Sequence, residues 1–225
     1  MIVLDNLAIG GTPPILERVS CTFPAGAVSA IVAPRGTGKT ALLLATLGLI
    51  PADAGTVSVD GVEPRHDPLA ARRRMCFVPS QAPAAPGLSV LGAARAIAGL
   101  ASGELPPASD ATHALRLSEI PDRLMAGPAA ALGSFHRLCV WLGVHRLRKT
   151  PILLMDDPTA HLNAQEIAAF GRLVRETLDA GRCVVFTARD LELSRAAEAE
   201  AVFRIDARTL RPTSSDRPPD PERPS

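Results

Sequence analysis

The 225-residue chain has few aromatic side chains, which make up 3% of it and include a single Trp and no Tyr. It therefore offers little surface on which nucleic-acid bases could stack. The excess of positive charge is small too: 24 Lys and Arg against 23 Asp and Glu give a formal net charge of +1, too little to hold a nucleic acid mainly by phosphate attraction. We expect no nucleic-acid partner.

Cysteines and long apolar runs are also few. The four cysteines lie far apart and form no CxxC or Cys/His cluster, which argues against a zinc site or a disulfide scaffold and favours a reduced, cytosolic protein. The apolar run ALLLATLGLI has about half the length needed to cross a bilayer, and the first residues lack the features of a secretory signal. If the protein works at a membrane, another chain must span it.

The sequence does contain a regular alternation of strand and helix patterns. Short β-rich runs occupy 2–9, 18–23, 27–32, 56–61, 75–78, 151–158, 183–187 and 201–205, and helical patterns cover 39–49, 164–178 and 191–199. Residues 86–149 change in character and are typical of several helices that form an insertion. This order predicts an α/β fold whose mostly parallel sheet is covered on both faces. The polar, Pro-rich residues 207–225 are expected to form a disordered tail.

A glycine-rich turn separates the strand near 27–32 from the following helix. It reads Ala33-Pro34-Arg35-Gly36-Thr37-Gly38-Lys39-Thr40 and fits the phosphate-loop pattern GxxxxGK[ST], except that Ala33 replaces the first glycine. Such loops turn backbone N–H groups inward around phosphate oxygens, and the helix adds the positive end of its dipole. We expect ATP phosphates to bind at 34–40. A methyl group at Ala33 is tolerable if that residue has a negative φ.

Two further residues predict a magnesium ion beside these phosphates. The Thr40 hydroxyl opens the helix, and Asp156 ends the buried run Ile152–Met155. A hydroxyl, one carboxylate and the phosphates themselves are the ligands that Mg²⁺ takes in such sites. Asp156 would hold the ion directly or through water, or it would merely cap the next turn.

With these motifs, residues 1–206 resemble the ATP-binding subunits of ABC transporters. The stretches ILERVSCTFPAGAVSAIVAPRGTGKTALLLATLGLI, DDPTAHLN and CVVFTARDLE carry the likeness. The resemblance implies a phosphate-loop NTPase core with an N-terminal antiparallel β part and a helical subdomain at about 86–149. It also implies that two subunits enclose two ATP molecules, each between one phosphate loop and the other subunit's signature sequence. Membrane-spanning partners would hold the protein at the cytoplasmic face of the membrane.

The chain departs from the family pattern where hydrolysis takes place. Asp157 stands where the family has a catalytic Glu, and a carboxylate one methylene shorter reaches water less well. Arg189 replaces the switch histidine; it cannot lose a proton, although it could stabilise a γ-phosphate. The alternatives are a helix-capping acid at Asp157 and a surface arginine at Arg189.

The signature LSGGQ is altered as well. Gapless counting back from the metal Asp gives Leu132, Gly133, Ser134, Phe135 and His136. Phe135 replaces a glycine and should obstruct the partner's ATP, although N–H groups at the start of the following helix would still permit weak contact. His136 is best read as a helix-surface residue.

Three smaller elements also differ. The glutamine-loop position falls on Ser80, with Gln81 next to it, and either residue would bind the metal or a water, or simply form a turn. The loop usually written SALD reads AHLN at 160–163 and has lost its acidic residue. No aromatic residue precedes Phe23, so adenine would be held by weaker apolar contacts or bound loosely.

These departures favour a degenerate ATP-binding subunit that binds Mg-ATP, hydrolyses it poorly or not at all, and forms a heterodimer with a more active ATP-binding subunit. Two alternatives stay open at this point: an ordinary active homodimeric transport ATPase, and a non-catalytic scaffold docked on membrane proteins.

Overall fold

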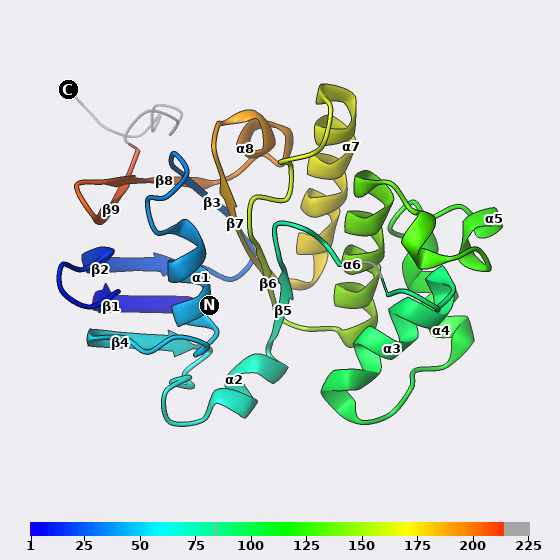
Figure 1. The fold of residues 1–225 in the computed structure, drawn as a ribbon, viewed down its shortest axis with the longest axis horizontal. Helices are drawn as coiled ribbons and strands as arrows, with labels where there is room; N and C mark the ends of the chain where they lie inside the picture. The colour runs from blue at the N-terminus through cyan, green and yellow to red at the C-terminus, as the bar shows by residue number, and fades with distance from the viewer. Residues whose placement is uncertain (84, 214–225) are drawn as a thin grey trace, which may run out of the picture.

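The structure is a computed structural model that describes residues 1–83 and 85–213. Two sheets and two groups of helices make up the fold (Figure 1). The smaller sheet has three antiparallel strands in the order β2-β1-β4, formed by β1 (Ile2–Ile9), β2 (Leu16–Phe23) and β4 (Ala54–Val59). The expected N-terminal antiparallel part is therefore present.

The larger sheet has six strands in the order β5-β6-β7-β3-β8-β9. They are β3 (Val28–Val32), β5 (Met75–Val78), β6 (Ile152–Met155), β7 (Cys183–Ala188), β8 (Ala201–Asp206) and β9 (Thr209–Pro212). All neighbours are parallel except β8 and β9, which form an antiparallel hairpin. The predicted fold class, a phosphate-loop core with a mostly parallel sheet, is confirmed.

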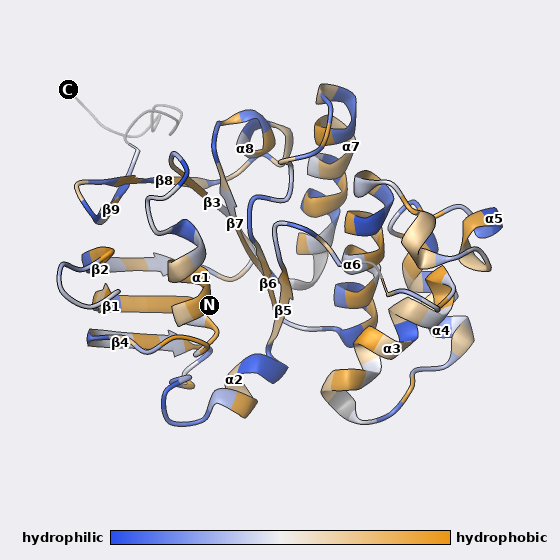
Figure 2. Cartoon of the chain, in the orientation of Figure 1, coloured by the Kyte–Doolittle hydropathy of each residue, from blue (hydrophilic) through white to orange (hydrophobic). Residues whose placement is uncertain are grey.

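Each face of the larger sheet belongs to its own apolar core. Leu153 and Met155 of β6 pack into a core shared with the helical side, whereas Ile152 and Leu154 pack into a core shared with the three-stranded sheet. This alternation follows from the two-residue period of a strand. Because both faces are covered, β3, β6 and β7 are buried along their whole length, and Figure 2 shows apolar residues along these inner strands.

The helices lie on both sides of this sheet. They are α1 (Lys39–Thr46), α2 (Pro68–Arg73), α3 (Val90–Ser102), α4 (Ala108–Arg116), α5 (Asp122–Met125), α6 (Ser134–Arg148), α7 (Ala164–Arg175) and α8 (Glu192–Ala196), with short 3-10 turns η1 (Ala129–Ala131) and η2 (Glu176–Ala180). Between β5 and β6 the chain forms only helices and turns, in the region expected to be a helical insertion. None of the helices in the described part of the chain is long and apolar enough to cross a membrane.

Several sequence-based expectations need correction. Strand β9 lies beyond residue 207, so the ordered part continues past the expected start of the tail because these residues pair with β8. Residues 214–225 of that tail lie outside the described residues. Helix α2 and strand β9 were not predicted, and α1 ends at Thr46 rather than near residue 49.

Two of the three consecutive arginines before β5, Arg72 and Arg74, bond backbone carbonyl groups. Arg72 donates to the carbonyls of Leu47 and Gly48, both at 3.1 Å. Arg74 donates to the carbonyl of Asp60 at 2.6 Å. These arginines therefore satisfy carbonyl groups at the end of α1 and in the turn after β4, which helices and turns leave without partners.

Candidate functional site

The phosphate loop connects β3 to α1 with the backbone that its glycines allow. Gly36 and Gly38 have φ values of 79° and 97°, in the left-handed region. A Cβ atom on Gly38 would lie 2.7 Å from Cγ2 of Ile15, so this position has no room for a side chain. Ala33 is not among the residues with positive φ, and its methyl group is therefore compatible with the loop. The hydroxyl of Thr37 donates to the Pro34 carbonyl at 2.9 Å and braces the turn.

The Lys39 side chain lies inside this loop. It is buried, and its ammonium group donates to the carbonyls of Ala33 at 2.5 Å and Pro34 at 2.7 Å. Burial lowers the pKa of Lys39 below its usual value of 10.5, while the carboxylates of Asp157 and Asp156 act against this shift. The loop thus collects a cation and several N–H groups at one end of the sheet, which is an arrangement suited to a polyphosphate.

Asp156 stands at the carboxyl end of β6 and joins three parts of the chain. One oxygen, Oδ2, accepts from the Thr40 hydroxyl at 2.8 Å, and Oδ1 accepts from the Thr187 hydroxyl at 2.7 Å. The two predicted magnesium ligands are therefore in direct contact. Within the described residues no group of three His, Cys, Asp or Glu side chains could hold a metal. A hydroxyl and a carboxylate that need phosphate oxygens to complete the shell suit Mg²⁺.

Thr187 is a site residue that the sequence reasoning missed. It lies fully buried on β7, donates to Asp156, and accepts from the backbone N–H of Asp157 at 2.9 Å. One hydroxyl thus fixes both acids at the end of β6. A hydroxyl near the end of an otherwise apolar strand, as in CVVFT, was the signal available in the sequence.

Asp157 and Arg189 form an ion pair at the edge of the loop. Nε and Nη2 of Arg189 both lie 2.8 Å from the same oxygen, Oδ2 of Asp157. Asp157 has a φ of 43°, an uncommon value for a residue with a side chain, and it turns the carboxylate towards β7. Asp157 therefore does not cap a helix, and Arg189 is not an isolated surface residue. The sequence reasoning had treated the two residues separately.

These residues border one cleft of about 440 Å³. Its walls include Lys39, Thr40, Asp156, Asp157 and Arg189, together with Arg35 of the loop and both Ser80 and Gln81. The structure thus brings both glutamine-loop candidates to the phosphate site, without distinguishing between them. Ile15, 44% exposed, forms an apolar part of the wall beside Gly38. It is the kind of contact expected for a base in the absence of an aromatic, and the sequence reasoning had not named it.

The signature-like segment lies at the start of α6. Gly133 is the N-cap residue, with no side-chain cap, and Ser134 borders a second cavity that shares Ser80, Gln81 and His161 with the phosphate cleft. Phe135 is half-buried against the helical core, together with Leu132, and its ring meets that of His136 edge-on at 5.5 Å between centroids.

Asn163 has a defined local role in the AHLN loop. Its side-chain oxygen accepts from the N–H of Glu166, and Glu166 accepts from the N–H of Asn163, both at 3.0 Å. This capping box starts α7. The Asn163 side chain, which replaces the family's acidic residue, is thus engaged in capping a helix of its own chain.

Comparison with known proteins gives a consistent result. A family model described as "ABC transporter" matches residues 16–160. The hemin import ATP-binding protein HmuV of Streptomyces coelicolor is 33% identical over 198 residues, which cover 86% of this chain and 71% of the relative. The cytochrome c biogenesis ATP-binding export protein CcmA of Rhodopseudomonas palustris is 31% identical over 200 residues, covering 84% and 95%. The ABC transporter cassette MJ0796, solved as a dimer, superposes with a TM-score of 0.83 over 95% of this chain and 98% of that one, at 20% identity.

Proposed function

The chain belongs to the ABC transporter family, and we propose that it is an ATP-binding subunit with weak or absent hydrolysis of its own. Cassettes of this family take ATP with Mg²⁺. In this chain the loop 34–40, through the N–H groups that follow Pro34, and the Lys39 ammonium would hold the phosphates. Thr40 and Asp156 would hold Mg²⁺, with Ser80 or Gln81 near it. Ile15 would contact the base.

One observation supports the proposal. The groups expected to bind phosphate and Mg²⁺ lie together, whereas Asp157, at the position of the family's general base, is bonded to another side chain. The Thr40 hydroxyl lies 2.8 Å from Oδ2 of Asp156, so one cation can bind both oxygens. Asp157, by contrast, is bonded to Arg189. A general base must be free to accept a proton from water at hydrogen-bond distance. A short carboxylate held by a permanent cation is a poor base, so we expect binding without efficient cleavage.

The proposed partner in the ATP sandwich is a second, more active ATP-binding subunit. Phe135 occupies a glycine position at the start of α6, so the segment 132–136 would approach another subunit's ATP poorly. A homodimer would carry this defect at both sites. A heterodimer would let the partner's signature complete the site on this chain, while residues 1–206, with the helical subdomain at about 86–149, supply the phosphate loop.

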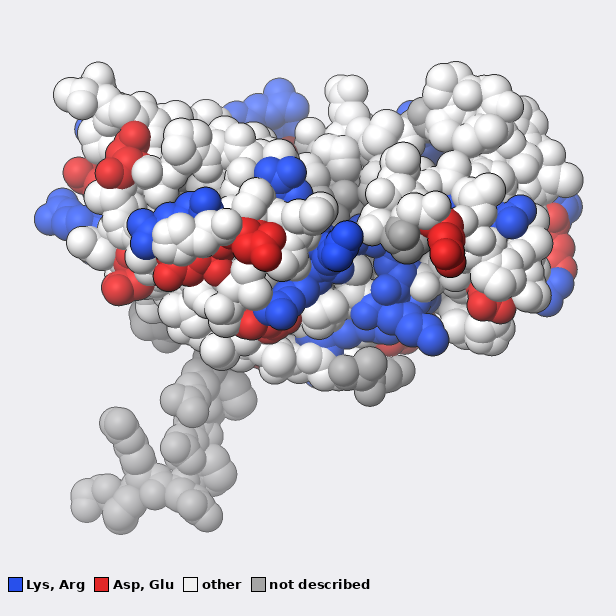
Figure 3. Space-filling view, turned by 90° about the horizontal axis from the view of Figure 1, so that it is seen from below, with Lys and Arg blue, Asp and Glu red and all other residues white. Residues whose placement is uncertain are grey.

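Membrane-spanning subunits are the other proposed partners, and they would hold the chain at the cytoplasmic face of the membrane. Relatives are named as import and export ATP-binding proteins, so neither direction nor substrate follows for this chain. An apolar groove lies between α2 and α3, where Leu49, Leu69 and Leu100 are 52%, 60% and 86% exposed. Arg73 and Arg148 also line it, and Figure 3 shows basic side chains gathered on this lower face. An apolar helix with acidic flanks, from a membrane subunit, would fit such a groove.

The test is an equilibrium titration of the purified chain with Mg-ATP, combined with a turnover measurement. Saturable binding with turnover far below the roughly 10 per second typical of enzymes would support the proposal. Turnover near that value would instead favour the active homodimer. Absence of saturable binding, even beside the native partner chains, would favour the scaffold.

Purification of the full chain from its source identifies the partners. We expect a second ATP-binding chain and a multi-spanning chain to co-purify. Leu69→Asp combined with Leu100→Asp should release the membrane chain and leave Mg-ATP binding unchanged, because neither residue borders the phosphate cleft. Retention of the membrane chain by this variant would exclude the groove as its docking site.

A further inference from the structure

A cleft separate from the nucleotide site borders the beginning of the phosphate loop. It has a volume of about 730 Å³, and Val32, Ala33 and Pro34 form part of its wall, whereas the nucleotide cleft is lined by later residues of the loop. The rest of the wall comes from α8, from the residues before it and from the carboxyl end of β8. Ligands of open α/β sheets bind outside the carboxyl ends of the strands, and a cleft of this size is large enough to hold one.

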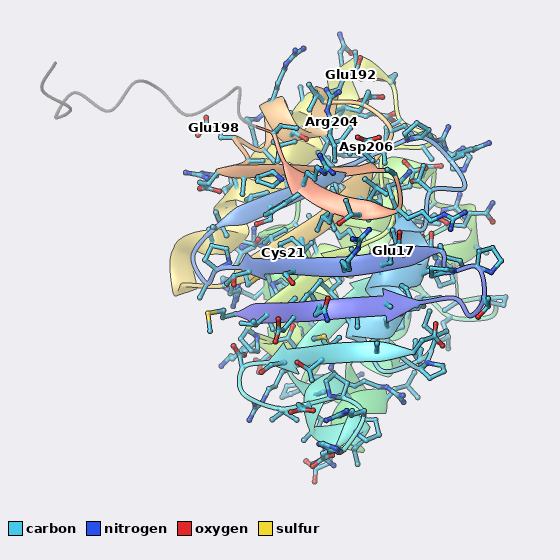
Figure 4. All side chains as sticks on the ribbon, turned by 90° about the vertical axis from the view of Figure 1, so that its left-hand side faces the viewer. Glu17, Cys21, Glu192, Glu198, Arg204 and Asp206 are labelled. Carbon is cyan, nitrogen blue, oxygen red and sulfur yellow. The ribbon has the colours of Figure 1, made fainter. Side chains whose placement is uncertain are left out.

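Two pairs of opposite charges stand at this cleft. Glu192 and Arg195 are three residues apart on α8 and therefore lie on the same side of the helix. Arg204 and Asp206 are two residues apart on β8 and therefore lie on the same face of the strand. All four side chains are exposed, and Figure 4 shows Arg204 and Asp206 next to each other with Glu192 above them. Helix and strand thus each offer one cation and one carboxylate.

These four side chains are free. None of them forms an ion pair or a hydrogen bond with any residue in 1–83 or 85–213. The two other charged residues of the wall are already engaged, because Arg189 bonds Asp157 and the Asp190 carboxylate accepts from the N–H of Glu192 at 3.0 Å. Two cations and two carboxylates therefore remain available to a ligand.

This mixture of charges limits the chemistry of the ligand. Within the described part of the chain no three His, Cys, Asp or Glu side chains could hold a metal. A ligand with negative charge alone would be repelled by the two free carboxylates, and an apolar ligand would remove water from charges without replacing it. A molecule with both a carboxylate and an ammonium group pairs with all four side chains. Val32, Leu191 and Ile205 form an apolar part of the wall, which suits an apolar ligand body.

We propose that this cleft binds a small zwitterion, a short peptide with free ends or an amino acid, that carries apolar side chains. Arg195 and Arg204 donate to its carboxylate. Its ammonium group donates to Glu192 and Asp206. A cleft of about 730 Å³ has room for a dipeptide, which also spans the distance between helix and strand more readily than a single amino acid does. This binding does not require a bound nucleotide.

The ligand chemistry is tested by titration calorimetry of the nucleotide-free full chain with leucyl-leucine, for which we expect saturable binding. N-acetyl-leucyl-leucine lacks the ammonium group, and leucyl-leucine amide lacks the carboxylate. Each should bind at least about 10-fold more weakly, because each loses a charge-assisted contact. Leucine alone distinguishes the two sources: weaker binding than the dipeptide identifies a peptide as the ligand, and equal or tighter binding identifies an amino acid.

The location is tested with variants of the strand. Arg204→Ala should weaken leucyl-leucine about 10-fold and leave the amide, which has no carboxylate to lose, within about 2-fold. Asp206→Asn should likewise weaken leucyl-leucine and leave the acetylated dipeptide unchanged. Arg211→Ala is the matched control, because Arg211 is exposed and lies directly opposite Arg204 on β9 but does not line the cleft. It should bind leucyl-leucine as the wild type does.

Three results would overturn the proposal. One is the absence of saturable binding for both leucyl-leucine and leucine. Another is equal binding of the free and the blocked dipeptides, which would indicate an apolar contact alone. The third is an equal loss in Arg204→Ala and Arg211→Ala, which would indicate a diffuse field of charge instead of a site. Thermal unfolding verifies the fold of each variant, and Arg204→Lys, which keeps the charge but not the fork, should retain part of the affinity.

Discussion

The two sides of the phosphate cleft are built by different means. On one side, the loop between β3 and α1 presents main-chain N–H groups, shaped by Gly36 and Gly38 at positive φ. On the other side, the residues that follow β6 and β7 present side chains, among them Asp157 and Arg189. The first side keeps the family pattern almost intact, whereas the second keeps Asp156 and departs from the pattern at Asp157 and Arg189.

The proposed retention of ATP binding with poor hydrolysis would follow from this difference. A ring of amides depends on backbone angles, and Ala33 satisfies those angles as well as a glycine does. Proton transfer depends on the reach of one carboxylate, and Asp157 is both shorter and bonded to a cation. The alanine at position 33 is thus tolerated on the main-chain side, whereas the aspartate at position 157 removes reach from the group that would accept a proton.

The largest expected effect tests the first side directly. Lys39→Ala should weaken Mg-ATP binding by roughly 10- to 100-fold, because an ammonium contact to phosphate is worth about 1.5–3 kcal/mol. Lys149, the second lysine of the chain, is exposed at the end of α6, and Lys149→Ala is the control that should bind as the wild type does. Unchanged nucleotide binding and transport in Lys39→Ala would instead identify a scaffold.

The next prediction concerns the stability of the fold, through a histidine buried on the helical side of the sheet. His145 lies fully buried near the end of α6, where Nδ1 is 2.7 Å from the Thr150 hydroxyl and Nε2 has no partner among the described residues. Burial lowers the pKa of His145 from 6.5 to about 3, and the charges of Arg182 and Arg146 add to this shift. The ring is therefore neutral in the folded chain at mildly acidic pH.

This depressed pKa makes stability depend on pH in a defined direction. Below about pH 6.5 the unfolded chain binds a proton that the folded chain refuses, so the free energy of unfolding falls as pH falls towards 3. Between pH 7 and pH 5 the loss from this group is about 2 kcal/mol. Urea unfolding at both pH values should show this loss in the wild type and in His113→Asn, an exposed control, but a smaller loss in His145→Asn. Equal losses in all three would contradict it.

Two variants of the phosphate loop exchange glycine and alanine in opposite directions and should have smaller effects. Gly38→Ala should cost about 1–2 kcal/mol in backbone strain alone, and its Cβ would also press on Ile15. Ala33→Gly should leave Mg-ATP affinity within about 2-fold and cost roughly 0.5–1 kcal/mol of stability through added chain freedom. Unfolding curves and ATP titrations of both variants measure this. A large gain in affinity from Ala33→Gly would show that the methyl group distorts the loop after all.

The smallest effect is expected where the family has its catalytic residue. Asp157→Asn should change ATP turnover in the assembled complex by less than about 2-fold, because a carboxylate bonded to Arg189 contributes little as a base. Phosphate release by the complex, with the partner subunit unaltered, is the measurement. A fall of 100-fold or more would identify this chain as an active ATPase and remove the contrast between the two sides.

The sequence predicted strands β1 and β5 well because each is a mainly apolar run between turn residues. The runs IVLDNLAI and MCFV coincide with β1 and β5, since such apolar segments between turns have few alternatives. Helix α2 and strand β9 were missed for the opposite reason. Helix α2 buries only Ala71, and β9 is an edge strand of polar composition, so neither carries a clear periodicity.

The sequence identified individual residues of the site but not the contacts between them. The phosphate-loop pattern named Lys39 and Thr40, and a strand-ending acid named Asp156. The bond between Asp157 and Arg189 joins positions 32 residues apart and depends on β6 and β7 being neighbours, which only the folded sheet reveals. Thr187 was overlooked on the same account, because its partners come from the adjacent strand.

The hydrogen bonds of Asp156 have a consequence for which residues evolution can accept at this position. Its two oxygens tie together segments that are 116 and 31 residues away in sequence. A descendant that had ceased to bind any metal would still need this acid as a joint within its architecture. An aspartate at this position is therefore favoured by the architecture itself, through its bonds to Thr40 and Thr187, independently of any bound cation.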